Sequence, residues 1–176
     1  GSSDSQILNG TFERMNQALL DVHGEASRDT LMRGNTLADG TIGVIIGGGG
    51  RAVHCNDQPR HHVLYNRITD CSIAGVSISD YTPTITVRSN EMADNSTQVL
   101  TTFGAHDIDI QRNTFRTAAI TPITVALQDS GDVRVHWNLF EDTCNPADAF
   151  LALGGAEAPV FEDNVFCLPE SSPQSQ

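Results

Sequence analysis

Apolar residues recur two positions apart along most of this chain, and an asparagine follows each pair at a fixed place. The asparagine lies three positions after the second apolar residue, and another apolar residue lies two positions beyond it. Four segments show this pattern: Ile85, Val87, Asn90 and Met92; Ile108, Ile110, Asn113 and Phe115; Val133, Val135, Asn138 and Phe140; and Pro159, Phe161, Asn164 and Phe166. Two more segments keep its later positions, with Thr30 and His61 in the first slot: Met32, Asn35 and Leu37; and Val63, Asn66 and Ile68. A spacing of two predicts strands that bury one face.

The six asparagines recur at nearly constant intervals of 31, 24, 23, 25 and 26 residues. A period in this range indicates a repeat architecture. Because apolar side chains point inward on both sides of each asparagine, the chain turns a corner there while still enclosing the same core. An asparagine at the same place in every coil can bond its amide to the backbone of the coils above and below, about 4.8 Å away. The pattern therefore predicts a coil of strands with a ladder of buried amides.

These motifs resemble the right-handed parallel β-helix of the pectin lyase-like superfamily, over about residues 30 to 166. The resemblance implies an all-β solenoid of about six to seven coils across residues 30–168, with the ladder at the tight turn between the second and third strands. That superfamily includes polysaccharide lyases and hydrolases, epimerases, phage tailspikes, adhesins and noncatalytic envelope proteins. A fold of this kind does not by itself fix a function.

The first strand of each coil is predicted between successive asparagines, at residues 42–46, 76–78, 99–103, 123–127 and 151–153. Residues 4–29 form either a first coil, with a strand through Ala18, Leu20 and Val22, or a cap in which residues 11–22 make an amphipathic helix. Residues 1–3 are interpreted as an expression scar, and residues 169–176, which are rich in Ser, Pro and Gln, as a disordered tail or linker. The open ends of the solenoid need capping by such segments or by another copy of the chain, which would make a homo-oligomer.

The net charge of the chain limits the classes of molecule that it can bind. The 22 acidic and 10 basic residues give a formal net charge of −12, which argues against nucleic acid and against anionic membranes. An acidic polysaccharide would also be repelled unless a metal mediated its binding. Every basic residue is arginine, so chemistry that needs a lysine base or Schiff base is excluded. No apolar stretch reaches the length of a membrane span.

The four cysteines are an even number in a fold that is commonly exported, which favours an extracellular, periplasmic or cell-envelope location. Cys144 and Cys167 follow their ladder asparagines by six and three positions, so they should lie near one corner of adjacent coils and can form a disulfide. Cys55 and Cys71 can form a second disulfide. The alternative is that all four are buried, reduced thiols.

Two columns of acidic residues follow from the register. Four places after the asparagines stand Asp39, Asp70, Asp94, Thr117 and Asp142. This column is interpreted either as turn residues or as a site for a cation such as calcium. Six places before the asparagines stand Asp29, Arg60, Thr84, Asp107 and Asp132. Asp107 and Asp132 should be neighbours, with His106 beside them, and are either turn residues or an acid and base pair for a glycosidic bond.

The longest interval, from Asn35 to Asn66, contains an insertion at residues 47–60 that concentrates titratable side chains. It carries Arg51, His54 and Arg60, and it is followed by His61 and His62, of which His62 should face outward. An insertion in a regular solenoid usually lies on the binding face. Its four consecutive glycines do not continue into a phosphate-binding motif, so a nucleotide site is excluded.

The outer face of the first-strand sheet is predicted to form a shallow groove for sugars, with Tyr81 stacking on a ring. Its polar positions include Ser77, Ser79, Thr102, Thr124 and Gln128, with Asp80 and Asp129 at the edge. The function predicted is a carbohydrate-active module that binds a polysaccharide in this groove or cleaves it as a hydrolase or lyase. The alternatives are a noncatalytic carbohydrate-recognition module of a larger secreted, envelope or phage protein and an architectural spacer. The candidate catalytic residues are Asp80, Asp107, Asp129 and His54. The candidate substrate-binding residues are Arg51, Arg60, His62, Tyr81, His106 and Gln128.

Overall fold

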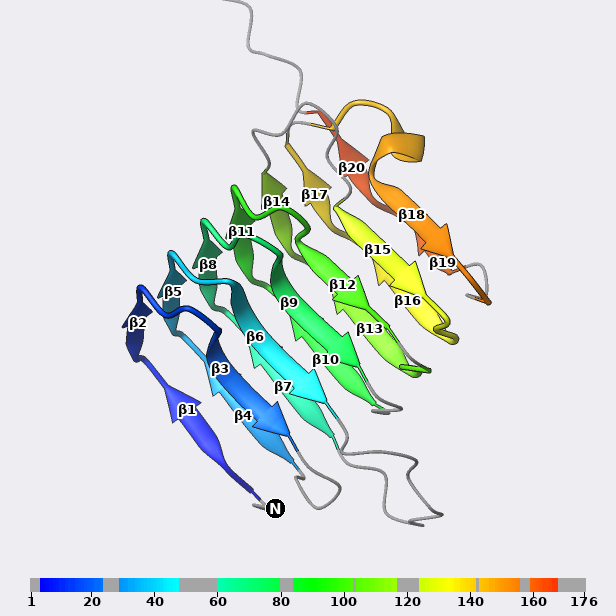
Figure 1. The fold of residues 1–176 in the computed structure, drawn as a ribbon. Coiled ribbons are helices and arrows are strands. Elements are labelled where there is room, and N and C mark those ends of the chain that lie inside the picture. Colours follow the sequence, from blue (N-terminus) through cyan, green and yellow to red (C-terminus); the bar gives the residue numbers. More distant parts are fainter. Residues whose placement is uncertain are drawn as a thin grey trace, which may run out of the picture.

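The computed structural model of the protein describes residues 4–23, 29–47, 60–79, 84–102, 104–116, 124–141, 143–155 and 159–167. In this part of the chain, three parallel sheets wind around one elongated core (Figure 1). Sheet A contains β1 (Gln6–Leu8), β4 (Thr30–Arg33), β7 (His61–Leu64), β10 (Ile85–Arg88), β13 (Ile108–Gln111), β16 (Val133–His136) and β19 (Val160–Glu162). Sheet B contains β2 (Thr11–Glu13), β5 (Thr36–Ala38), β8 (Arg67–Thr69), β11 (Glu91–Ala93), β14 (Thr114–Arg116), β17 (Leu139–Phe140) and β20 (Val165–Phe166). Sheet C contains β3 (Ala18–His23), β6 (Ile42–Gly47), β9 (Ala74–Ser79), β12 (Val99–Thr101), β15 (Val125–Gln128) and β18 (Phe150–Leu153).

Each coil runs from sheet C to sheet A to sheet B, and each strand pairs in parallel with its equivalents one coil away. We name the corners the C–A edge, the A–B edge and the B–C edge. Seven strands in each of sheets A and B and six in sheet C confirm the predicted solenoid and its number of coils.

The ladder asparagines stack at the A–B edge, as the sequence predicts. Asn66 Oδ1 accepts from the Asn35 backbone N–H at 2.9 Å and from Asn35 Nδ2 at 3.0 Å. Asn66 Nδ2 in turn donates to the Met32 carbonyl and to Asn90 Oδ1, both at 3.0 Å. The same pattern continues to Asn164, so one amide per coil satisfies the backbone groups that the corner would otherwise bury unpaired.

Equivalent inward side chains of successive coils stack in files along the axis of the solenoid and fill its core. Met32, Val63, Val87, Ile110 and Val135 form one file inside sheet A and are fully buried. At the C-terminal end the core becomes aromatic, with the Phe140 ring centroid 5.1 Å from that of Phe115 and 4.8 Å from that of Phe166.

The N-terminal segment is the first coil, and the helical alternative for residues 11–22 is wrong. Phe12 pairs in register with Leu37 in sheet B, and Leu20 with Val44 in sheet C. Met15, which the helical interpretation needs on the apolar face, is 47% exposed. Strand pairing prevails because it extends an existing sheet edge, whereas a short helix has weak stability of its own. The single helical element among the described residues is the 3₁₀ turn Pro146–Asp148.

The disulfide predicted between Cys144 and Cys167 is present, with the two Cα atoms 4.8 Å apart. It closes a loop with a sequence separation of 23 residues. By chain entropy alone a loop of this size stabilises the fold by about 3 kcal/mol.

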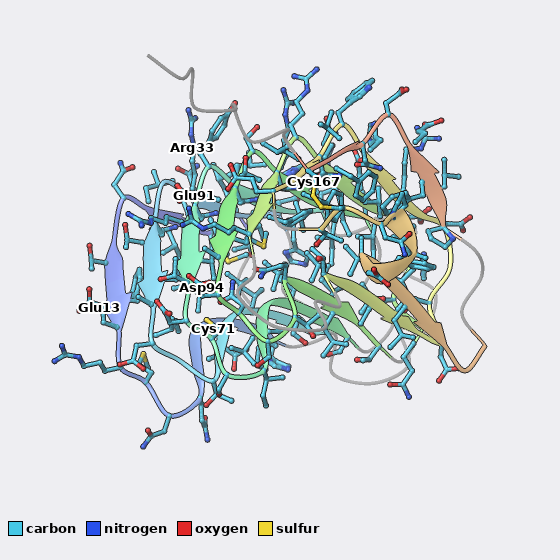
Figure 2. All side chains as sticks on the ribbon, turned by 90° about the horizontal axis from the view of Figure 1, so that it is seen from above. Glu13, Arg33, Cys71, Glu91, Asp94 and Cys167 are labelled. Atoms are coloured by element: carbon cyan, nitrogen blue, oxygen red, sulfur yellow. A yellow bond between two sulfur atoms is a disulfide. The ribbon has the colours of Figure 1, made fainter. Side chains whose placement is uncertain are left out.

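The second predicted disulfide does not form, because Cys71 is a buried free thiol. Cys71 lies near Asp94 at the B–C edge, where its backbone N–H donates to Asn95 Oδ1 (Figure 2). Burial raises the pKa of the Cys71 thiol to about 11. Cys55 lies outside the described residues, between β6 and β7 in the sequence; β6 ends and β7 begins at the C–A edge, a different corner from that of Cys71.

His61 faces the core and makes the fold sensitive to acid. It is 2% exposed, and its Nδ1 atom has no hydrogen-bond partner among the described residues. Burial lowers the pKa of His61 from 6.5, against an opposing effect of Asp29. The unfolded chain therefore binds a proton more readily than the folded one, and stability falls as the pH drops below about 6.5.

We expect His61→Ile to raise the free energy of unfolding by about 1 kcal/mol at neutral pH, because it removes an unpaired buried polar group next to Ile85. The gain should grow toward about pH 5.5, since the isoleucine cannot be protonated. Urea unfolding across this range measures both effects, with the outward His62→Gln as the control. An unchanged pH slope in His61→Ile would contradict this account.

Candidate functional site

Polar side chains gather on the outer face of sheet A, on the two neighbouring strands β13 and β16. The residue that precedes β13, Asp107, adjoins Asp132, which precedes β16, and the Ile108 backbone N–H donates to the Asp132 carbonyl at 3.1 Å. Asp109 pairs in register with Arg134, and Gln111 with His136. Because side chains alternate across a strand, these residues share the outer face while Ile108, Ile110, Val133 and Val135 fill the core.

A surface hollow of about 520 Å³ lies over this face at the C–A edge. Its lining residues are Asp107, Ile108, Asp109, Asp132, Val133, Arg134 and Val160. Three carboxylates and one guanidinium thus border one hollow, on coils whose strands are about 4.8 Å apart. Such an arrangement can hold hydroxyl groups and exchange protons with a bound molecule.

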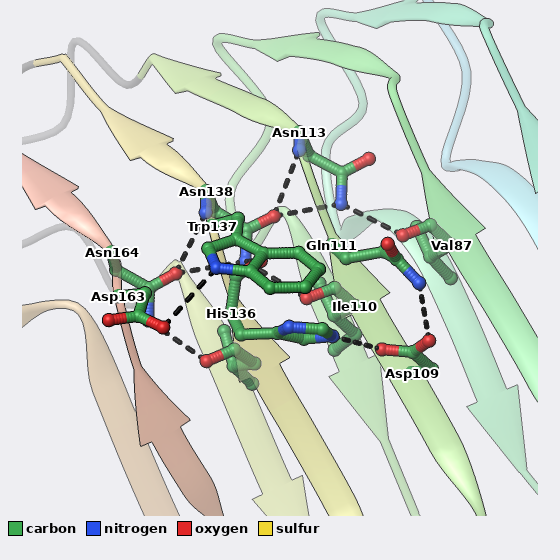
Figure 3. A network of polar contacts seen from close by, with 11 residues as sticks. Val87, Asp109, Ile110, Gln111, Asn113, His136, Trp137, Asn138, Asp163 and Asn164 are labelled. Carbon is green, nitrogen blue, oxygen red and sulfur yellow. Dashed lines mark hydrogen bonds and ion pairs between the residues drawn. The ribbon is translucent and has the colours of Figure 1, made fainter.

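Asp109 is held by a hydrogen-bond network that crosses two coils (Figure 3). His136 Nε2 lies 2.7 Å from Asp109 Oδ1, and Gln111 Nε2 donates to Asp109 Oδ2 at 2.5 Å. The His136 side chain is 8% exposed, and its ring centroid lies 4.4 Å from that of Trp137. Trp137 Nε1 donates to Asp163 Oδ2 at 3.2 Å. The network fixes the orientation of Asp109 at the hollow.

Asp107 is more accessible. Its side chain is 52% exposed, and Oδ2 lies 3.1 Å from His106 Nδ1. Asp107 and Asp132 both adopt the left-handed backbone conformation, with φ of +54° and +49°. Aspartate tolerates that conformation better than most residues, so the corner explains why aspartates stand here. Their placement around one hollow is the additional feature that a turn role does not require.

Two other predicted site residues lie on the same outer face. Arg60 is exposed and forms an ion pair with Asp29, with Nε 3.4 Å from Oδ1. His62 is half-buried and faces outward, as predicted, in the file that continues through Thr86 to Asp109.

The remaining predicted residues are not gathered around this hollow by the described contacts. Asp129 Oδ1 accepts from the Gly155 backbone N–H at 2.6 Å, a contact suited to a turn residue. Gln128 lies half-buried on the outer face of sheet C. Arg51, His54, Asp80 and Tyr81 lie outside the described residues.

The outer face of sheet C differs from the polar groove that the sequence predicts. One of its two outward files contains Ile45, Ser77, Leu100, Ala126 and Leu151. Ser77 is only 8% exposed between its larger neighbours. Thr124, which immediately precedes β15, is 1% exposed rather than outward, and its carbonyl accepts from the backbone N–H groups of Gln98 and Val99.

The acidic column at the B–C edge has the geometry of turn residues. Asp39, Asp70 and Asp94 have φ of +56°, +57° and +57°, and all three are exposed. Within the described ranges, no three His, Cys, Asp or Glu side chains are grouped so that they could hold a metal ion. Nor does any helix in those ranges have the length and apolar character to cross a membrane.

Several residues at this face were not anticipated: Asp109, Gln111, Arg134, His136 and Trp137. The first four are the polar positions that alternate with the apolar ones in the two clearest repeats, so the repeat itself contained the information. Trp137 immediately precedes a ladder asparagine, a position that is exposed in each described coil except at the half-buried Ser89, and it is 49% exposed.

Three parallel sheets wind around one core, with an asparagine ladder at the A–B edge. These features define the class of protein as a parallel β-helix. The chain matches the family model described as right handed beta helix region over residues 1–166, and it belongs to this family. Comparison with curated proteins and with solved structures gave no match.

Proposed function

We propose that the protein binds a neutral polysaccharide on the outer face of sheet A and hydrolyses a glycosidic bond at the hollow beside Asp107 and Asp132. The observation that carries this proposal is the pair of carboxylates on successive coils, bordering one hollow with Asp109 and Arg134. Glycoside hydrolysis needs two carboxyl groups on opposite sides of the scissile bond. The hydroxyl-rich substrate would find both acceptors and a donor in the lining.

In the mechanism that this geometry supports, one carboxyl group protonates the glycosidic oxygen and the other attacks the sugar or activates water. Asp107 and Asp132 stand on adjacent coils, and the distance between their carboxyl groups decides the stereochemistry: about 5–5.5 Å gives retention of anomeric configuration, and about 6.5–9.5 Å gives inversion. His106, within hydrogen-bond distance of Asp107, would position that carboxyl group and exchange its proton with solvent.

Charge favours a neutral substrate. A net charge of −12 repels a polyanion, and Arg134 is the one basic residue among the described residues that line the hollow. A lyase acts on a uronic acid, whose carboxylate would meet three aspartates in this hollow. Hydrolysis of a neutral polymer avoids that repulsion. The disulfide is in keeping with an extracellular or cell-envelope location, where such polymers occur.

The test is a panel of neutral and acidic polysaccharides, assayed for new reducing ends and for the ultraviolet absorbance of unsaturated products. We expect reducing ends from a neutral polymer without unsaturated absorbance. Unsaturated products from an acidic polymer would contradict hydrolysis and indicate that the protein is a lyase, which cleaves by elimination.

The second candidate is a noncatalytic carbohydrate-recognition module. It is favoured by two exposed aromatic side chains at the A–B edge, Tyr65 at 51% and Trp137 at 49%. An arginine guanidinium lies over each ring, Arg33 at 5.2 Å and Arg112 at 5.3 Å from the ring centroid. Binding to the same panel without release of reducing ends would favour this function over hydrolysis.

A further inference from the structure

A second hollow, of about 330 Å³, lies on the other side of the A–B edge, over the outer face of sheet B. Its side chains alternate hydrogen-bond donors, acceptors and hydroxyls: Ser89, Glu91, Arg112, Thr114, Arg116 and Glu141, with the ladder residue Asn90 beneath. They come from β11 and β14 and from the turns beside β11, β14 and β17. Strands β14 and β17 belong to the same coils as β13 and β16 of the first hollow, and β11 belongs to the adjacent coil.

The charges of this hollow suit a neutral, hydroxylated molecule. Two arginines face two glutamates, so the lining carries little net charge in a chain of charge −12. Glu91 Oε1 lies 3.9 Å from Arg67 Nε, whereas neither Arg112 nor Arg116 forms an ion pair with another described residue. The guanidiniums of Arg112 and Arg116, which form no ion pair within the described residues, can donate to sugar oxygens while Glu141 accepts from sugar hydroxyls.

The two hollows are joined by polar side chains. Asp109 lines the first hollow and is bonded to His136, whose ring packs against Trp137 (Figure 3). Arg112, which lies over the Trp137 ring, lines the second hollow. A ligand that follows β13 and β16 therefore meets polar groups without interruption from the first hollow to the A–B edge.

We propose that the second hollow is a binding subsite for a further sugar residue of the same neutral polysaccharide, with Arg116 and Thr114 as its central contacts and Trp137 at its rim. The inference rests on the proposed function for the identity of the polymer. The subsite supplies binding energy remote from the reacting bond, so it favours long chains over short ones.

Trp137 is the only tryptophan of the chain, so its fluorescence reports on this place alone. We expect linear oligosaccharides from at least one of glucose, mannose, galactose or xylose to change that fluorescence with saturation. Arg116→Gln, which removes a charged donor, should weaken the apparent affinity about tenfold. Arg14→Gln is the control, because Arg14 is exposed at the B–C edge of the first coil and does not line the hollow. It should leave the affinity unchanged.

The outcomes separate this inference from the proposed hydrolysis. If reducing ends are released but no saccharide alters the Trp137 fluorescence, the second subsite is overturned and hydrolysis stands. If fluorescence changes saturate and depend on Arg116 while no reducing ends appear, the subsite stands and hydrolysis fails. Equal weakening by Arg116→Gln and Arg14→Gln would also overturn the subsite, and so would full affinity in a Thr114→Val variant.

Discussion

Replacing Asn113 by alanine should lower the free energy of unfolding by about 4 kcal/mol. Asn113 Oδ1 accepts from the Asn90 backbone N–H at 2.9 Å and from Asn90 Nδ2 at 3.0 Å. Its Nδ2 donates to the Val87 carbonyl at 2.9 Å and to Asn138 Oδ1 at 3.0 Å. Alanine leaves several of these groups buried and unpaired, and each costs about 1–3 kcal/mol.

Asn164→Ala is the matched control for that experiment, because Asn164 is the last asparagine of the ladder. It is only half-buried and has a ladder asparagine on one side, with Nδ2 donating to the Val135 carbonyl. Urea unfolding should show a clearly smaller loss for Asn164→Ala than for Asn113→Ala. Equal and small losses would mean that the ladder is not what stabilises the A–B edge.

The second large effect concerns the carboxylate pair. We expect Asp107→Asn and Asp132→Asn each to reduce kcat by at least about a hundredfold on the polysaccharide that the unmodified protein hydrolyses. The double variant should lose little more than either single variant, since the two groups act on one bond. Reducing-end release measures all three.

Asparagine adopts the left-handed conformation as readily as aspartate, so these substitutions should leave folding intact. Asp39→Asn is the matched control: Asp39 has φ of +56°, close to the +54° of Asp107, but lies at the B–C edge away from the hollow. Full activity in Asp107→Asn, or an equal loss in Asp39→Asn, would remove the carboxylate pair from the chemistry.

The fold could be predicted from the sequence because two independent patterns indicate the register of the coils. The period of two marks which side chains point inward, and the asparagine marks where each coil turns. Together they align Asn35 with Asn164 without any knowledge of the intervening loops. The same alignment brought Asp107 beside Asp132 and placed Cys144 near Cys167, since both pairs depend only on the number of residues from a ladder position.

What register cannot supply is the shape and polarity of the outer surface. Thr124, immediately before β15, was predicted to face outward, yet it is 1% exposed. Cys71 was predicted to pair with Cys55 and so tie the insertion to the next coil, whereas it is a buried free thiol at the B–C edge. The bond between Asp109 and His136 joins residues 27 positions apart, and it depends on side-chain rotamers rather than on strand alignment.

The polysaccharide face can also be located directly, by amide chemical shifts of the Asp107→Asn variant with a bound oligosaccharide of the hydrolysed polymer. The account predicts shifts along β13 and β16 of sheet A, centred on Asp109, Arg134 and His136. Shifts confined to β12 and β15 of sheet C, around Thr102 and Gln128, would contradict it and move the binding face to the other side of the C–A edge.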